Sequence, residues 1–277
     1  MKFGFVTCVQ LGLSCIEEIY RIGGKLDVLI TIPDNKAKSK SGRIYLDGIA
    51  DKYNIPLYKL NHINDNECID IINKYNLDWL FIIGWSQIVS NQVLNSPKSG
   101  CIGMHPTLLP VGRGRAAIPW AIIKGLDKTG VTMFVMDEGV DTGDILGQIE
   151  IPIKSDTTAT DLYNKVTDAH IDLISEIFPL LKSDNYSIHV QDESQATYWE
   201  GRTPADGQLD SSMTINEADA LIRGTTHPYP GAYYIKDKEK FIIWKAEFSS
   251  LRSSPIDFEL KDGYIKPIDY TCINNEL

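Results

Sequence analysis

The chain has 277 residues, of which 43% are hydrophobic and 23% are charged, values of a globular protein rather than a disordered one. This length exceeds what one hydrophobic core usually serves, so one large domain and one smaller domain are expected. The formal net charge of −10 argues against a general polyanion-binding protein, because contact with many phosphates needs a concentration of Lys and Arg.

The chain shows no uninterrupted apolar stretch of about 18 residues, which a membrane-spanning helix needs. Its first residues resemble a strand and carry no charged-then-apolar signal pattern. Its five cysteines are scattered without C-x-x-C spacing, which favours reduced thiols over disulfides or a zinc site. We therefore expect a cytoplasmic protein that has no membrane partner and binds no metal.

The N-terminal half alternates short apolar strands with amphipathic helices, the pattern of a parallel sheet covered on both faces. Strands are expected at 3–7, 27–32, around Leu57, and at 79–83, 100–104 and 131–136. Helices are expected at 14–22, 46–53, 65–74 and 120–124, the first of them opening at a capping-box pattern, Ser14-Cys15-Ile16-Glu17. The sequence therefore predicts an α/β, Rossmann-like N-terminal domain with a mostly parallel sheet.

The most regular helix begins at Thr158-x-x-Asp161 and repeats apolar residues from Leu162 to Ile177 at spacings of three and four. After a polar connector the pattern changes to short strands, with one capped helix from Thr214 and a lysine-rich hairpin turn at 236–240. We predict two domains, a larger α/β domain over 1–184 and a smaller β-rich domain over 185–277.

Two polar clusters follow predicted strands and are expected at the same edge of the sheet, beyond the carboxyl ends of the strands, where ligands bind in open α/β sheets. His105 begins a loop rich in Gly, Pro and Arg, and three carboxylates, among them Asp141, follow the next strand. A lone histidine at a strand end is more often structural, but a histidine and an aspartate in one cleft suit general-base catalysis. The imidazole takes a proton near neutral pH, and the carboxylate orients the ring and stabilises its cation.

The run His105-Pro106-Thr107-Leu108-Leu109-Pro110 with Arg113-Gly114 and the later Asp141-Thr142-Gly143-Asp144 closely resembles the folate-dependent formyltransferases. That family includes the methionyl-tRNA, glycinamide ribonucleotide and sugar N-formyltransferases. The 36 residues from His105 to Asp141 are similar to its spacing. The segments 197–199, 202–207 and 227–232 resemble the accessory domain shared by the tRNA and sugar branches.

This resemblance implies transfer of a formyl group from N10-formyltetrahydrofolate to an amine. His105 would remove the amine proton, and Asp141 would support His105. In the family an asparagine two residues before the histidine stabilises the oxyanion, but here that position is Gly103. A backbone N–H, a water or a side chain must then replace it, and Ser86, Gln87 and Thr107 are the side-chain candidates.

The resemblance also implies where the two substrates bind. The pterin would contact the loops after two strands, through residues Ile83, Gly84, Trp85, Ser86, Asp137, Glu138, Gly139 and Asp141. No Walker A motif and no G-x-G-x-x-G follows the first strand, which argues against a nicotinamide enzyme. The acceptor would contact the loop after His105, through Thr107, Arg113, Gly114 and Arg115.

Charge discriminates between the possible acceptors. Residues 185–277 carry nine Lys or Arg and fifteen Asp or Glu, a balance of −6 that would repel a tRNA. The basic loop with Lys36, Lys38, Lys40 and Arg43 could contact tRNA, although a solvated loop is the simpler interpretation. Glycinamide ribonucleotide enzymes generally lack a second domain. The two arginines Arg113 and Arg115 suit the diphosphate of a nucleotide sugar, or else each forms a surface ion pair.

We therefore predict an N10-formyltetrahydrofolate-dependent N-formyltransferase that acts on a UDP- or dTDP-linked amino-dideoxy sugar for surface-glycan or glycoprotein biosynthesis. The alternatives are a methionyl-tRNA formyltransferase, a formyltetrahydrofolate hydrolase, and a non-catalytic folate or nucleotide-sugar binding protein. No nucleic-acid partner is expected. The sequence leaves the oligomeric state open, with a homodimer as one alternative.

Overall fold

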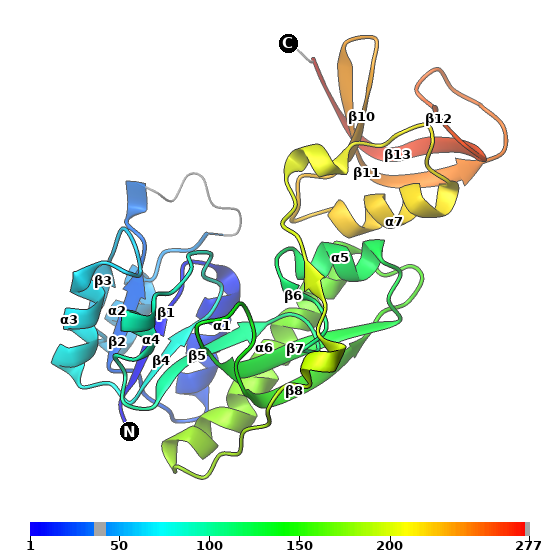
Figure 1. The fold of residues 1–277 in the computed structure, drawn as a ribbon. Coiled ribbons are helices and arrows are strands. Elements are labelled where there is room, and N and C mark those ends of the chain that lie inside the picture. The colour runs from blue at the N-terminus through cyan, green and yellow to red at the C-terminus, as the bar shows by residue number, and fades with distance from the viewer. Residues whose placement is uncertain (36–42, 275–277) are drawn as a thin grey trace. The chain divides into compact units, whose positions relative to one another are not determined.

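The computed structural model describes residues 1–35 and 43–274 (Figure 1). The chain forms two compact units, each assembled from several segments. Unit 1 comprises Met1–Arg113, Gly130–Ile151 and Val166–Tyr198, and unit 2 comprises Gly114–Thr129, Pro152–Lys165 and Trp199–Leu277. The boundary after residue 184 stays a prediction, and Lys36, Lys38 and Lys40 lie outside the described residues.

A seven-stranded sheet forms the centre of the N-terminal half, with the strand order β3-β2-β1-β4-β5-β7-β8. Its strands are β1 (Phe3–Val6), β2 (Val28–Thr31), β3 (Leu57–Lys59), β4 (Trp79–Ile82), β5 (Gly100–His105), β7 (Lys128–Val135) and β8 (Ile145–Pro152). Strands β1 to β5 pair in parallel, and β7 pairs with β5 in the antiparallel sense. The predicted α/β fold with a mostly parallel sheet is confirmed.

The helices of this half are α1 (Gln10–Arg21), α2 (Asp47–Tyr53), α3 (Asn66–Tyr75), α4 (Asn91–Leu94), α5 (Ala117–Ile123) and α6 (Ala159–Lys182). The expected start of α1 at Ser14 is wrong. The helix begins at Gln10, and the Ser14 hydroxyl donates to the Gln10 carbonyl within the first turn instead of capping. Strand β8 was not expected, although its alternating Gln148-Ile149-Glu150-Ile151 is the pattern of a half-buried strand.

Alternate residues of the parallel strands face opposite sides of the sheet. On one side, a core of strand residues packs with helix α3; its buried members include Val6, Ile30, Leu80, Ile71 and Ile72. On the other side, the ring of Phe178 in α6 lies 4.7 Å from that of Phe3 and 6.2 Å from that of Phe81. Both faces of the sheet are therefore covered here, which explains why strands β1, β2 and β4 are buried at every position.

Helix α6 begins at the predicted capping box, since the Asp161 carboxylate accepts from the backbone N–H and the hydroxyl of Thr158. The helix also buries His170, whose Nδ1 donates to the Val166 carbonyl at 2.7 Å. Burial lowers the pKa of His170 to about 4, so the imidazole is neutral in the folded protein at physiological pH.

We expect His170 to make the protein sensitive to mild acid. The unfolded chain binds a proton at this imidazole below a pH of about 6.5, whereas the folded protein binds it only near pH 4, so stability falls as the pH drops between these values. Urea unfolding at pH 7, 6 and 5 measures this effect. Below the pKa of the unfolded chain, the free energy of unfolding of wild type should fall by about 1.4 kcal/mol per pH unit more than that of His170→Gln. The exposed His189, as His189→Gln, is the matched control. Parallel stability profiles for wild type and His170→Gln would contradict this expectation.

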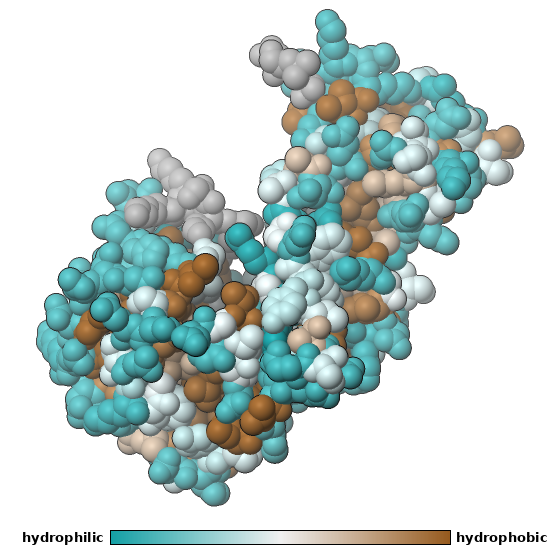
Figure 2. Space-filling view, viewed as in Figure 1, coloured by the Kyte–Doolittle hydropathy of each residue, from teal (hydrophilic) through white to brown (hydrophobic). Residues whose placement is uncertain are grey.

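The C-terminal part of unit 2 is a four-stranded sheet with one helix against it. Its elements are α7 (Ile215–Thr225), β10 (Ala232–Lys236), β11 (Glu239–Ser249), β12 (Phe258–Leu260) and β13 (Gly263–Asn274), in the sheet order β10-β11-β13-β12. Helix α7 begins at the predicted capping box of Thr214 and Glu217 and packs Leu221 and Ile222 into the apolar core of the sheet. Hydrophilic residues cover most of the visible surface of this sheet, with apolar residues scattered among them (Figure 2).

Short elements lie between the larger ones, among them the 3-10 helix η3 (Pro204–Gly207). Strands β6 (Arg113–Gly114) and β9 (Tyr198–Trp199) pair with each other, and the 3-10 helix η2 (Glu193–Gln195) precedes β9. Within residues 1–35 and 43–274, no helix is long and apolar enough to cross a membrane.

Candidate active site

His105 is the last residue of β5, and both nitrogens of its buried imidazole face protein oxygens. Nε2 lies 2.8 Å from the carbonyl oxygen of Gly112, and Nδ1 lies 3.5 Å from Oδ2 of Asp141. A carbonyl oxygen can only accept, so Nε2 carries the proton in the neutral ring, and Nδ1 is the atom that can take another. At 3.5 Å, Nδ1 and the carboxylate are too far apart for a short hydrogen bond, and their contact is an ion pair only when the ring is protonated.

The loop that follows His105 is fastened to strands β7 and β8 by two polar side chains. The hydroxyl of Thr132 donates to the Thr107 carbonyl at 2.7 Å and accepts from the Leu109 N–H at 3.1 Å. The amide of Gln148 donates to the Leu109 carbonyl and to the Thr132 hydroxyl. Sequence reasoning missed Thr132 and Gln148, because they belong to no motif and act through contacts between distant strands.

The loop that carries Asp141 reaches His105 by an unexpected route. Because β7 runs antiparallel to β5, its end lies beside Cys101, where the Met136 N–H donates to the Cys101 carbonyl at 2.8 Å. The expectation that both loops leave the same edge of the sheet is therefore wrong for β7. The chain turns back, with Asp141 in the left-handed conformation at φ 57°, and so brings the carboxylate to the imidazole.

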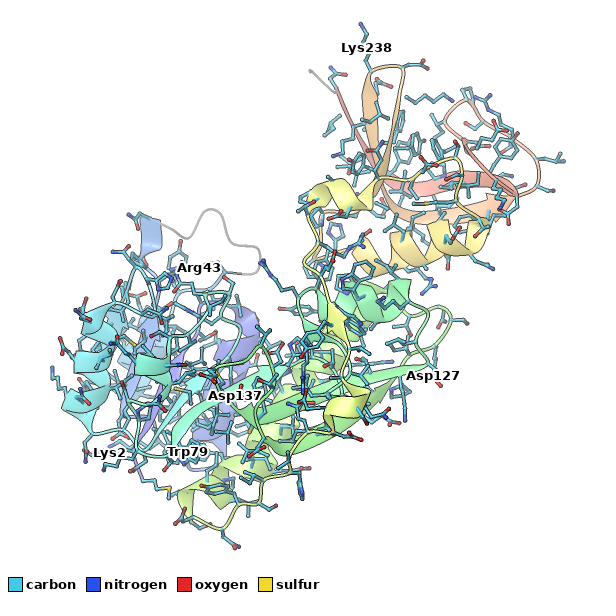
Figure 3. The ribbon with its side chains drawn as sticks, in the orientation of Figure 1. Lys2, Arg43, Trp79, Asp127, Asp137 and Lys238 are labelled. Atoms are coloured by element: carbon cyan, nitrogen blue, oxygen red, sulfur yellow. The ribbon has the colours of Figure 1, made fainter. Side chains whose placement is uncertain are left out.

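Two residues hold the turn that contains Asp141. Oδ1 of Asp137 (labelled in Figure 3) accepts from the Gly139 N–H and from the Thr142 hydroxyl. Gly143 passes so close to the backbone that an added Cβ would lie 1.7 Å from the Val135 carbonyl oxygen. Any side chain at position 143 would therefore displace the turn and the carboxylate with it.

The predicted pterin-binding residues come from two loops of unit 1. Ile83 is buried, Trp85 is half-buried with its indole N–H donating to Gln87, and Gly84, Ser86, Glu138 and Gly139 are exposed. The Glu138 carboxylate accepts from the side-chain amide of Asn91 at the start of α4. Trp85 and Met136 pack against the same apolar cluster, so the two loops border one surface.

The predicted acceptor-binding residues differ in how far they are buried. Thr107 is buried, and its hydroxyl has no hydrogen-bond partner within the described residues. Arg113 is fully buried, with its guanidinium hydrogen-bonded to Gln191, Glu193 and Tyr198, and this pairing lowers the pKa of Glu193. That placement favours a structural role for Arg113, and its contact with an acceptor stays a prediction. Of the two arginines, Arg115 is the exposed one.

Gly114 separates these two arginines in a conformation that only glycine adopts easily. Its φ is +111°, and an added Cβ would lie 2.3 Å from the carbonyl oxygen of Trp199. The backbone of Gly114 therefore lies directly against β9, which leaves no room for a side chain.

The space beside Gly103 is filled by side chains of the protein itself. Position 103 lies two residues before His105 in β5, so the two residues face the same side of the sheet. Gly103 pairs with Phe134 across the sheet, and an added Cβ would lie 2.9 Å from Cζ of Phe134 and 3.1 Å from Cγ of Met136. The aromatic ring thus occupies the place that an asparagine side chain would need.

The three side-chain candidates for the oxyanion donor differ in availability. The amide nitrogen of Gln87 donates to the Asn61 carbonyl, and its oxygen accepts from the Ile63 N–H. Thr107 is buried, whereas Ser86 is exposed. Ser86 is therefore the candidate whose position allows contact with a ligand.

Family profiles match both halves of the chain. The profile described as "Formyl transferase" matches residues 16–178, and "Formyl transferase, C-terminal domain" matches residues 202–265. The methionyl-tRNA formyltransferase of Clostridioides difficile (strain 630) is 32% identical over 285 residues, which cover 100% of this chain and 92% of the relative.

Solved structures share the fold. A 4-N formyltransferase from Francisella tularensis is 26% identical with a TM-score of 0.66, and the match covers 85% of this chain and 93% of that one. The N-formyltransferase from Helicobacter canadensis, in complex with folinic acid and dTDP-3-aminofucose, is 19% identical with a TM-score of 0.71, covering 96% and 99%. Because the first profile spans more than half of the chain and the C. difficile relative aligns along all of it, the chain belongs to the formyl transferase family of enzymes.

Proposed function

We propose that the protein transfers the formyl group of N10-formyltetrahydrofolate to the amine of a UDP- or dTDP-linked amino-dideoxy sugar, in the cytoplasm, for surface-glycan or glycoprotein biosynthesis. The observation that carries the chemistry is the contact between Nδ1 of His105 and the Asp141 carboxylate in a member of the formyl transferase family. The folate and sugar-nucleotide ligands of the Helicobacter canadensis structure support the choice of substrates.

His105 is the proposed general base. Its Nε2 is engaged by the Gly112 carbonyl, so Nδ1 accepts the proton that the attacking amine releases. The Asp141 carboxylate then faces the positively charged imidazolium at 3.5 Å and stabilises it. A bound folate would supply the electrophilic formyl carbon. The amine nitrogen would bond to that carbon as the bond to N10 breaks, and N10 would leave with the proton that His105 has taken up.

The pterin is proposed to lie against the two loops that border Trp85 and Met136. A planar heterocycle needs an apolar surface and a few polar groups at its edge, and the half-buried indole and the exposed backbone of Gly84 and Glu138–Gly139 provide them. Ser86 at the same surface is the proposed donor to the formyl oxygen. The residues present thus fit this group.

The acidity of residues 185–277 supports a small acceptor over a tRNA. Nine basic and fifteen acidic residues in this segment oppose binding to a polyphosphate backbone. Arg43 (labelled in Figure 3) is the described member of the basic loop, and its guanidinium donates to the backbone carbonyls of Ile32, Pro33 and Ile44. These contacts give Arg43 a structural role and leave the exposed Arg115 as the proposed partner of the diphosphate.

Transfer to methionyl-tRNA is the second candidate function, because the relative of that name from C. difficile is 32% identical along the whole chain. Turnover of N10-formyltetrahydrofolate should be measured with a panel of UDP- and dTDP-amino sugars, with methionyl-tRNA, and without an amine. Turnover that requires an amino sugar supports the proposal. Turnover with methionyl-tRNA alone, or without any amine as in a hydrolase, would refute it.

Acceptor binding should depend only weakly on salt. A single diphosphate releases few counterions, so its Kd should change less than about tenfold between 50 and 200 mM salt, whereas six to ten phosphate contacts would weaken binding by roughly 10³–10⁵-fold. Calorimetric titration of the preferred sugar nucleotide at three salt concentrations measures this. A steep slope together with tight tRNA binding would exclude the sugar assignment.

A further inference from the structure

The connector, residues 186–198, lies between the two segments that the family profiles match and packs entirely within unit 1. His189 of the connector pairs with Ile145 at the start of β8 through two backbone hydrogen bonds of 2.8 and 2.9 Å. These bonds hold the connector beside the loop that carries Asp141, and neither family profile includes this segment.

Gln191 of the connector contacts both loops of the candidate active site with one buried amide. Its Nε2 donates to the backbone carbonyls of Asp141 at 2.9 Å and of Gly143 at 2.7 Å. Its Oε1 accepts from Nε of Arg113 at 3.2 Å and from Nη2 at 2.8 Å. The side chain is 5% exposed, so water does not readily replace these bonds.

Arg113 links Gln191 to the loop that holds the imidazole of His105. Its guanidinium is also held by the carboxylate of Glu193 and by the hydroxyl of Tyr198. Its neighbour Gly112 donates its N–H to the Thr197 hydroxyl and offers its carbonyl to Nε2 of His105. A continuous series of hydrogen bonds therefore runs from the backbone of Asp141 through Gln191 and Arg113 to the loop that holds the imidazole.

We propose that Gln191 is a positioning residue for formyl transfer, which fixes the Asp141 loop against the His105 loop and so sets the separation of the carboxylate and Nδ1. This inference rests on the proposed function. The backbone of Asp141 adopts φ 57°, a left-handed conformation that costs a non-glycine residue free energy, and contacts around the turn must offset this cost. The two bonds from Gln191 to the carbonyls of Asp141 and Gly143 enforce that turn.

Gln191→Met tests the proposal, because methionine has a similar length and lacks both the donor and the acceptor. We expect kcat to fall by about tenfold or more, while KM for the folate and for the acceptor changes less than about threefold, since the reacting groups move and the binding surfaces do not. Gln195→Met is the matched control, because Gln195 is exposed in η2 and, among the described residues, its side-chain amide donates to its neighbour Ser194 alone. It should leave kcat unchanged.

A double-mutant cycle separates positioning from a general structural role. If Gln191 acts by placing the carboxylate of Asp141, Gln191→Met should have little further effect on kcat in an Asp141→Asn background. If Gln191 has only a structural role, the fold-decreases in kcat of the two single variants should multiply in the double variant. Multiplied losses, or a Gln191→Met enzyme within twofold of wild type, would overturn the proposal.

If Gln191→Met does not fold, Gln191→Glu provides a second test of the same role. The glutamate keeps its contact with Arg113 but cannot donate to the two carbonyls, so the same loss of kcat is expected, and near-wild-type kcat would reject the role.

His105→Asn and Asp141→Asn are measured in parallel. If either retains normal turnover, the proposed catalytic pair is wrong and the inference about Gln191 falls with it; if both are inactive while the Gln191 variants are active, only the inference is wrong.

Discussion

His105→Asn and Asp141→Asn should each lower the rate of formyl transfer by at least about 100-fold while leaving folate binding nearly intact. An asparagine at position 105 keeps a donor for the Gly112 carbonyl but has no basic nitrogen to replace Nδ1. An asparagine at position 141 tolerates the left-handed backbone of this residue but brings no negative charge to the imidazolium. Both substitutions thus remove the chemistry and preserve the local structure.

Single-turnover rates and the Kd of a folate analogue measure the two effects separately. Thermal unfolding of each variant verifies that the fold is retained. A variant that keeps near-normal turnover on the true acceptor would disprove the assignment of that residue. A large loss of folate affinity with an unchanged rate at saturation would place the residue in binding instead of in proton transfer.

Gly103→Asn should lower kcat by about tenfold or more, even though it restores the residue that the family uses. The new Cβ would lie 2.9 Å from Cζ of Phe134, closer than real side-chain contacts allow, and the amide would need still more space. Forcing extra atoms into a packed site typically costs about 1–3 kcal/mol and shifts its neighbours. Because position 103 lies on the face of β5 that carries His105, the shift should reach the imidazole.

Two further variants identify the cause of this loss. Gly48→Asn is the matched control, because an added Cβ at Gly48 in α2 meets no described atom within 4 Å, and it should leave kcat unchanged. Gly103→Asn combined with Phe134→Ala removes the obstructing ring and should recover part of the activity. A clear rise in kcat for Gly103→Asn alone, with unchanged acceptor affinity, would instead show a native site that lacks an oxyanion donor.

The sequence was sufficient to predict features that depend on local pattern. The capping boxes at Thr158 and Thr214 were recognisable because both members of each box lie three residues apart. The strands before His105 were recognisable because a strand buried on both faces is apolar throughout. The catalytic pair could be proposed because histidine and aspartate loops with this spacing resemble a known family.

Features that depend on contacts between distant segments could not be predicted. The antiparallel direction of β7 appears only in its pairing with β5, which no local pattern encodes. Gln191 lies 50 residues from Asp141 along the chain, and a glutamine in a polar connector carries no signal of its own. The collision at Gly103 likewise depends on Phe134, which pairs with it across the sheet.

The connector determines where the domains of two related enzymes should be joined in a hybrid. Residues 186–198 stand outside both matched segments, so a hybrid enzyme could be joined on either side of them. Four connector side chains form hydrogen bonds with the N-terminal loops at Gly112, Arg113 and Asp141. They are those of Gln191, Glu193, Thr197 and Tyr198. A hybrid that takes its C-terminal domain from another enzyme should therefore be joined after Tyr198, since a junction near residue 184 would import a connector selected for a different pair of loops.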